Sequence, residues 1–159
     1  MGSDMVESAC LQELTLLEQM RDFLDKLANP PAPIQEIRTI KDWQVRRNGD
    51  LFELKRELAI NTAYSMDIPA ELLDGVEVQR IAMYFSAANA RDVTINFIPG
   101  HVSGSVYERM YTVTTEIAQS ILIVFGRDYQ YTNLRNVNIT TANGTAGDKI
   151  YTTVTLRKI

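Results

Sequence analysis

The period of the hydrophobic pattern changes once along this chain, at Asn29-Pro-Pro-Ala-Pro33. Before this segment, apolar residues recur every three or four positions, which is the period of an amphipathic helix. After it, they recur at every second position, which is the period of a strand with one buried face. Because proline cannot continue a helix, the sequence predicts an N-terminal helical arm followed by a β domain.

The first pattern predicts a helix over about residues 5–28. Asp4 and Glu7 have the spacing of a capping box, and Asn29 can adopt the left-handed conformation that ends a helix. One half of the helical wheel is apolar, and it contains Val6, Cys10, Leu14, Leu16, Leu17, Met20, Phe23, Leu24 and Leu27. The rows with 4-3-4 spacing last about two heptads, which is shorter than a coiled-coil seam requires.

The apolar face of this helix needs a partner surface, and the sequence leaves three open. These are the β domain of the same chain, the helices of other copies, and a different protein. The opposite face is acidic, whereas helices that lie on membranes favour Lys and Arg, so no membrane partner is expected. The candidate assembly interface consists of Leu14, Leu17, Met20, Phe23, Leu24 and Leu27.

The second pattern predicts a mainly β fold, an antiparallel β-sandwich or jelly-roll-like body of about eight strands. Alternation is clear in residues 60–68, 81–85 and 93–97, and Gly- or Asn-containing turn signals separate the runs. Residues 51–60 suit either a helix or a strand, and the preceding Asn-Gly turn signal favours the strand. The continuous apolar run at 121–125 is interpreted as a strand buried on both faces.

These patterns divide the chain into three segments. Residues 1–29 form the amphipathic helical arm, residues 30–41 a Pro-rich linker and lead-in, and residues 42–159 the β-sandwich domain. The net charge of −4 falls entirely on the arm, since the basic and acidic residues balance in the remainder. A neutral body with an acidic arm suggests two parts with different roles.

Composition excludes several classes of function. A chain with one cysteine has no internal disulfide or Cys-based zinc site, and one histidine excludes a multi-His metal site. The acidic balance argues against a nucleic-acid partner. No run is long and apolar enough for a membrane span, and residues 1–9 lack the features of a signal peptide.

No motif points to catalysis or to a cofactor. His101 lies near Ser103 and Ser105 in a Gly-rich loop, but no nucleophile motif and no positioned acid accompany it. Trp43, the only tryptophan, is interpreted as part of an early strand edge and not as a platform for a sugar. The sequence therefore predicts that the protein is not an enzyme and needs no cofactor.

The helical arm, the break at Pro30-Pro31 and the Thr-rich β body to Ile159 together resemble the accessory structural proteins of tailed bacteriophages. These are capsid decoration, collar and tail-adaptor proteins, and the resemblance in layout spans the whole chain. It implies a homo-oligomer, with a trimer favoured, that binds other structural proteins of a larger lattice. It also implies a location in the virion, or in the cytoplasm if the protein is not viral.

Two functions therefore remain. The first is a non-enzymatic structural or assembly protein, as the resemblance implies. The alternative is a β-sandwich module that binds carbohydrate or peptide. The first predicts a stable oligomer or association with a large assembly, and the second predicts a monomer that binds its ligand.

Overall fold

The computed structural model describes residues 15–24, 35–100 and 108–159. The chain divides into two compact units, Met1–Pro33 and Ile34–Ile159, and each is described by itself. In the first unit, residues 15–24 form a helix, which confirms the helical prediction for that stretch. The remainder of the predicted helix, including Leu14 and Leu27, lies outside the described residues.

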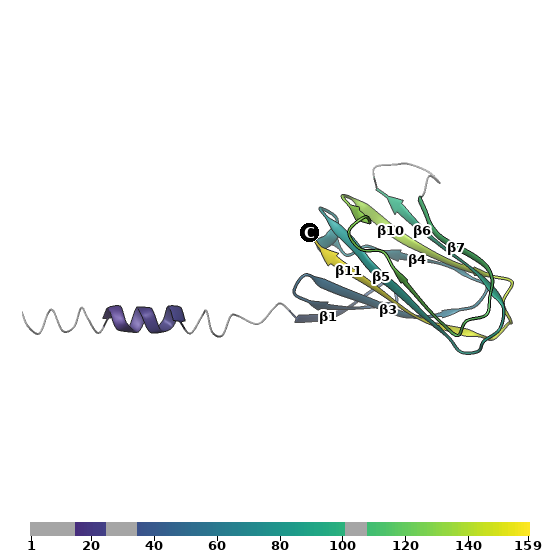
Figure 1. The fold of residues 1–159 in the computed structure, drawn as a ribbon, viewed down its shortest axis with the longest axis horizontal. Coiled ribbons are helices and arrows are strands. Elements are labelled where there is room, and N and C mark those ends of the chain that lie inside the picture. The colour runs from purple at the N-terminus through teal and green to yellow at the C-terminus, as the bar shows by residue number, and fades with distance from the viewer. Residues whose placement is uncertain (1–14, 25–34, 101–107) are drawn as a thin grey trace, which may run out of the picture. The chain divides into compact units, whose positions relative to one another are not determined.

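The second unit is built almost entirely of strands (Figure 1). Its described residues form eleven strands and one short 3-10 helix, η1 (Ala70–Leu72). The strands are β1 (Gln35–Ile40), β2 (Trp43–Asn48), β3 (Leu51–Ala59), β4 (Ala63–Asp67), β5 (Val76–Phe85), β6 (Arg91–Pro99), β7 (Glu108–Glu116), β8 (Ser120–Val124), β9 (Gln130–Tyr131), β10 (Leu134–Ala142) and β11 (Lys149–Lys158).

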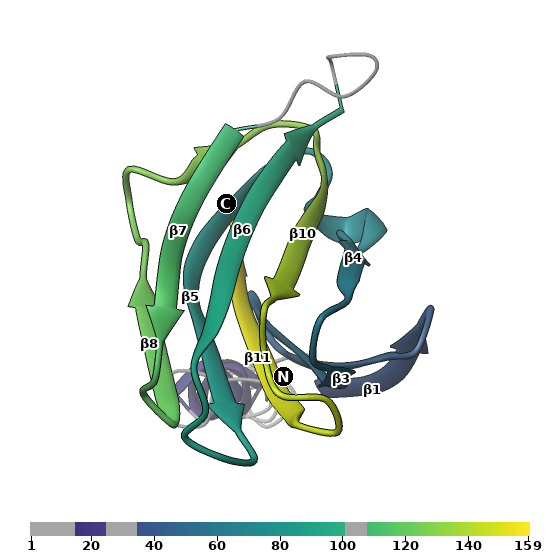
Figure 2. The same cartoon turned by 90° about the vertical axis from the view of Figure 1, so that its right-hand side faces the viewer.

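The strands form two antiparallel sheets that face one another (Figure 2). Sheet A has the order β1-β2-β3-β11-β5-β8, with β9 also paired to β5, and sheet B has the order β4-β10-β6-β7. Apart from the β1–β2 hairpin and β9, each sheet has four strands, and the chain crosses between them in the order of a jelly roll. The predicted jelly-roll-like sandwich of about eight strands is therefore confirmed, with three further strands added to sheet A.

The first strand lies inside the segment that the sequence assigned to the linker and lead-in. β1 pairs with β2, with Ile40 opposite Trp43, so Lys41 and Asp42 form a two-residue turn. Both have positive φ, at 44° and 71°, as a type I′ hairpin turn requires. Type I′ turns usually contain Asn-Gly or Asp-Gly. Because Lys-Asp is not such a pair, the sequence does not indicate a hairpin at this position.

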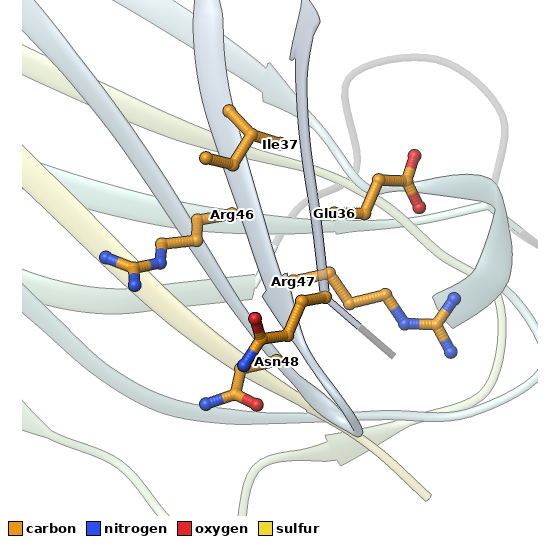
Figure 3. Close-up of a pocket in the computed structure, with 6 residues that line it drawn as sticks. Glu36, Ile37, Arg46, Arg47 and Asn48 are labelled. Atoms are coloured by element: carbon orange, nitrogen blue, oxygen red, sulfur yellow. The ribbon is translucent and has the colours of Figure 1, made fainter. Parts of the chain in front are cut away.

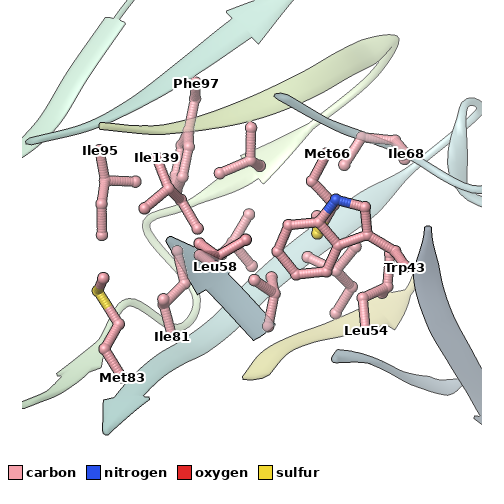
Figure 4. Packing of buried hydrophobic residues seen from close by; sticks show 14 of the residues in the cluster. Trp43, Leu54, Leu58, Met66, Ile68, Ile81, Met83, Ile95, Phe97 and Ile139 are labelled. Carbon is pink, nitrogen blue, oxygen red and sulfur yellow. The ribbon is translucent and has the colours of Figure 1, made fainter. Parts of the chain in front are cut away.

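The core lies between the two sheets and takes alternate side chains from each (Figure 4). Leu54, Leu58 and Ile81 from sheet A meet Ile95 and Ile139 from sheet B. This is the period-2 burial that the alternation predicts. The buried aliphatic and aromatic side chains supply the hydrophobic free energy that stabilises the sandwich.

Two further predictions about the body have different outcomes. Residues 51–60 are strand, because β3 covers Leu51–Ala59. Trp43 is 1% exposed and belongs to the core, so it is no platform, but the predicted edge position is wrong because β2 lies between β1 and β3.

The interpretation of residues 121–125 as a doubly buried strand is wrong. β8 is an edge strand of sheet A, and it buries Ile121 while Leu122 and Val124 are 62% and 72% exposed. A continuous apolar run has the same pattern whether its second face is covered or open. Only the pairing of the strands decides between the two, and that pairing is not local in sequence.

Candidate functional site

The N-terminal helix, residues 15–24, carries the candidate assembly interface. Among the predicted interface residues, Leu17, Met20, Phe23 and Leu24 lie in this helix, and each is 58–62% exposed. At 100° per residue they fall on one stripe with Leu16, which is equally exposed. Four of the six predicted residues therefore share one apolar face of this helix, while Leu14 and Leu27 lie outside the described residues.

An apolar face of this size is unfavourable when it contacts water. Full burial of a Leu, Met or Phe side chain is worth about 1.5–3 kcal/mol, and five such side chains share this stripe. An amphipathic helix also gains most of its stability from packing its apolar face. Both considerations favour a partner surface for this helix.

A hollow of about 340 Å³ lies beside the β1–β2 hairpin (Figure 3). It is lined by Gln35, Glu36, Ile37, Arg46, Arg47 and Asn48. Figure 3 shows the Arg46 and Arg47 guanidinium groups pointing to opposite sides of the hairpin, as successive residues of a strand do. The two cations therefore do not converge on one ligand position.

Two arginines of the hairpin contact other groups of the protein. The Arg47 Nε donates to the Gly49 carbonyl oxygen at 2.9 Å, and the Arg38 Nη2 donates to Glu71 Oε1 at 2.7 Å. The hydrogen bond to Glu71 is the main cause that raises the pKa of Arg38 above its usual value. The contact between Arg38 and Glu71 ties β1 to η1.

The outer face of sheet A carries a second exposed group of side chains. Tyr84 on β5 and Tyr151 on β11 lie directly opposite one another, with ring centroids 6.3 Å apart and an angle of 34° between the rings. Both are about half exposed, and the Gln119 Nε2 donates to the Tyr84 hydroxyl at 3.1 Å. On β8 the same face continues with Leu122 and Val124.

No group of three or more His, Cys, Asp or Glu side chains suited to a metal ion occurs within residues 15–24, 35–100 and 108–159. None of the helices described is long and apolar enough to cross a membrane. His101 and Cys10 lie outside the described residues.

Comparisons with known proteins give similarity of fold at low identity. No protein-family model matches the chain, and no curated protein matches it. A chain in the acidic-stable capsid structure of Helicobacter pylori bacteriophage KHP30 is 12% identical, with a TM-score of 0.46, over 78% of this chain and 93% of that one. At this score the similarity assigns no function.

The chain also shows low similarity to solved structures of quite different proteins. A family 16 carbohydrate-binding module is 11% identical, with a TM-score of 0.34, over 74% of this chain and 86% of that one. Hydroxypropylphosphonic acid epoxidase from S. wedmorenis is 10% identical, with a TM-score of 0.31, over 76% of this chain and 55% of that one.

Two features of the exposed surface were not predicted from the sequence. Leu16 was on the apolar half of the wheel but was not included in the interface, although it is as exposed as its neighbours. The open apolar face of β8 was assigned to the core. The helical wheel already placed Leu16 beside the interface residues, so its inclusion could have been predicted. No local pattern in the sequence identifies β8 as an edge strand.

Proposed function

We propose that this chain is a non-enzymatic structural protein that assembles with copies of itself through the apolar face of the N-terminal helix. The observation that carries the proposal is the single stripe of five large apolar side chains on one face of this helix, Leu16, Leu17, Met20, Phe23 and Leu24. The stripe occupies about 120° of the wheel, which is wider than the two-row seam of a two-helix coiled coil. The proposed oligomer is a trimer, as the resemblance in layout to phage accessory structural proteins implies.

The oligomer is proposed to bind other structural proteins of a larger assembly, as a component of a virion. This part rests on the layout of helical arm, proline break and Thr-rich β body. The proposal includes no nucleic-acid partner and no membrane partner. A neutral jelly-roll body attached to an associating arm is suited to repeated protein-protein contacts.

The experiment is a paired substitution on the helix. Leu17→Asp with Leu24→Asp places two charges in the contact, where burying them unpaired is costly. Arg21→Asp changes the net charge by the same amount and leaves the stripe intact. Light scattering after size exclusion should show dissociation for the double variant and an unchanged mass for Arg21→Asp. Equal masses for the two would reject the helix as the interface.

A second candidate function is a carbohydrate-binding module, and the exposed pair Tyr84 and Tyr151 favours it. Two aromatic faces on an open sheet suit the apolar faces of sugar rings, with the Gln119 amide beside them. Affinity electrophoresis in gels containing soluble polysaccharides tests this candidate. Retardation that is lost in Tyr84→Ala with Tyr151→Ala would support it, and unretarded migration in every polysaccharide would count against it.

A further inference from the structure

Among the described strands of five or more residues, four lie at sheet edges, and only one of these lacks charged residues. β1 and β8 border sheet A, where the two-residue β9 also pairs with β5, and β4 and β7 border sheet B. Charged side chains on an edge discourage pairing with another strand. The charged residues of the other three edges are Glu36, Arg38, Asp67, Glu108, Arg109 and Glu116. β8, with the sequence Ser-Ile-Leu-Ile-Val, has neither charge nor proline.

The backbone of β8 offers hydrogen-bonding groups along its free side. Phe85 N–H donates to the Gln119 carbonyl at 2.8 Å, and Phe125 N–H donates to the Gln79 carbonyl at 2.9 Å. Because hydrogen-bonded positions alternate along an antiparallel pair, Ile121 and Ile123 turn their backbone groups toward β5. Residues 120, 122 and 124 turn theirs toward the free edge, and β8 pairs with β5 alone among the described strands.

Two apolar side chains lie along this edge. Leu122 and Val124 are 62% and 72% exposed and lie on the outer face of sheet A. On β5, Ala82 lies opposite Leu122 and the exposed Arg80 lies opposite Val124. A strand added to this edge would therefore cover apolar surface as well as pair its backbone groups.

The edge is held in place at both ends. Before β8, the buried Arg91 donates to the carbonyl oxygens of Glu116 at 2.9 Å and of Ala118 at 2.6 Å. After β8, the Phe125 ring packs on Phe97, with the centroids 5.2 Å apart. A preformed edge loses little conformational entropy on pairing.

We propose that β8 pairs antiparallel with β8 of a second copy, across a two-fold axis at Leu122, so that the two A sheets become one continuous sheet. In this register Leu122 lies opposite Leu122 of the partner subunit, and Ser120 lies opposite Val124 of the partner subunit. All three outward-facing positions of each strand then form hydrogen-bonded pairs. The apolar outer faces of the two strands become continuous across the axis.

A second copy fits this edge for three reasons. The register pairs the strand with itself and leaves no outward backbone group unpaired. The strand has no charge, so two identical edges do not repel one another. One pair of five-residue strands covers less than the roughly 1,000 Å² that a stable interface needs, and an oligomer held by its helices presents several such edges together, which raises the avidity.

The inference rests on the proposed function, because it uses the helix-held oligomer to bring the edges together. It places the β8 contacts between such oligomers, with a two-fold axis in addition to the three-fold axis of the helices. Contacts of both kinds would generate a closed assembly of two oligomers or an extended lattice.

Site-specific cross-linking of the full chain tests the register. All variants carry Cys10→Ser, so that the introduced cysteine is the only one. Cα atoms of a hydrogen-bonded antiparallel pair are about 5.5 Å apart, which is within the range of a disulfide. Leu122→Cys should therefore form covalent dimers on mild oxidation or with a short bis-maleimide.

Two matched variants provide the control. In this register, residue 120 and residue 120 of the partner subunit are four residues apart along the strand. At about 3.4 Å per residue this is about 14 Å, too far for a disulfide in Ser120→Cys. The same distance separates the two copies of residue 124 in Val124→Cys. Neither should cross-link alone, and an equal mixture of the two should. Cross-linking of either variant alone at the rate of Leu122→Cys would overturn the register and the proposal.

The same samples separate this inference from the proposed function. If Leu122→Cys fails to cross-link while light scattering shows the helix-held oligomer, the edge pairing is wrong and the proposed function is unaffected. If Leu122→Cys cross-links in the register given above while the chain with Leu17→Asp and Leu24→Asp keeps the mass of the unchanged chain, the edge pairing stands and the helix is not the interface.

Discussion

The guanidinium carbon of Arg91 lies 3.7 Å from the centroid of the Phe85 ring. Arg91 is buried, with only 1% of its surface exposed. Its Nη groups donate to the carbonyl oxygens of Ala87, Glu116 and Ala118 at 2.6–2.9 Å. Burial lowers the pKa of Arg91, but arginine stays protonated in proteins. One buried cation therefore joins β6 to the β5–β6 and β7–β8 connections.

Replacing this cation should destabilise the sandwich. Arg91→Met keeps an unbranched side chain but leaves three carbonyl groups without their donor, and hydrogen bonds to charged groups contribute about 1.5–3 kcal/mol each. We expect a loss of about 3 kcal/mol in the free energy of unfolding. Urea denaturation measures it, with the exposed Arg46→Met as a control that should change stability by less than about 0.5 kcal/mol.

The Glu77 carboxylate should make stability depend on acid pH. Arg157 Nε donates to Glu77 Oε2 at 3.0 Å, and this hydrogen bond is the main cause that lowers the pKa of Glu77 from its usual 4.5. A lowered pKa in the folded state contributes stability that is complete above the unfolded pKa. That contribution is lost as the pH falls through the folded pKa.

Glu77→Gln should therefore melt at a lower temperature than the unchanged protein at pH 7. The difference should shrink as the pH falls below about 4.5. Thermal unfolding followed by circular dichroism between pH 7 and pH 2 measures this, and Glu57→Gln on the exposed face of β3 is the control. A difference in Tm that stays constant over the whole range would contradict the role of the ionised carboxylate.

The β body should fold without the arm. Every buried hydrophobic residue of the described chain belongs to Ile34–Ile159, so this unit contains a core of its own. A chain that begins at residue 30 should show β-type circular dichroism and one cooperative thermal transition. A molten or insoluble product would show that the arm contributes to the core.

How far the sequence could predict this structure depends on whether a feature is local. Alternation in β5 and β6 predicted their buried faces, because the order of apolar and polar residues within one strand decides which face is buried. The helix of residues 15–24 was equally visible from its period. The hairpin at Lys41 and Asp42 was missed, since its positive φ values occur in residues that rarely adopt them.

The candidate surfaces differ in the same way. The apolar stripe that includes Leu17 and Phe23 could be read from the helical wheel alone. The open edge at Leu122 could not, because its exposure depends on which strands flank β8. Ser120–Val124 is as apolar as a central strand, and only the order of sheet A places it at a border.

The central claim is that the helix holds copies of this chain together, and the molar mass of the full chain in solution tests it most directly. Light scattering across a concentration series should give a mass near three times the 18.0 kDa of one chain. The chain that begins at residue 30 should give the mass of a monomer at the same concentrations. A full chain that remains at 18.0 kDa throughout, or a truncated chain that keeps the mass of the oligomer, would contradict the account.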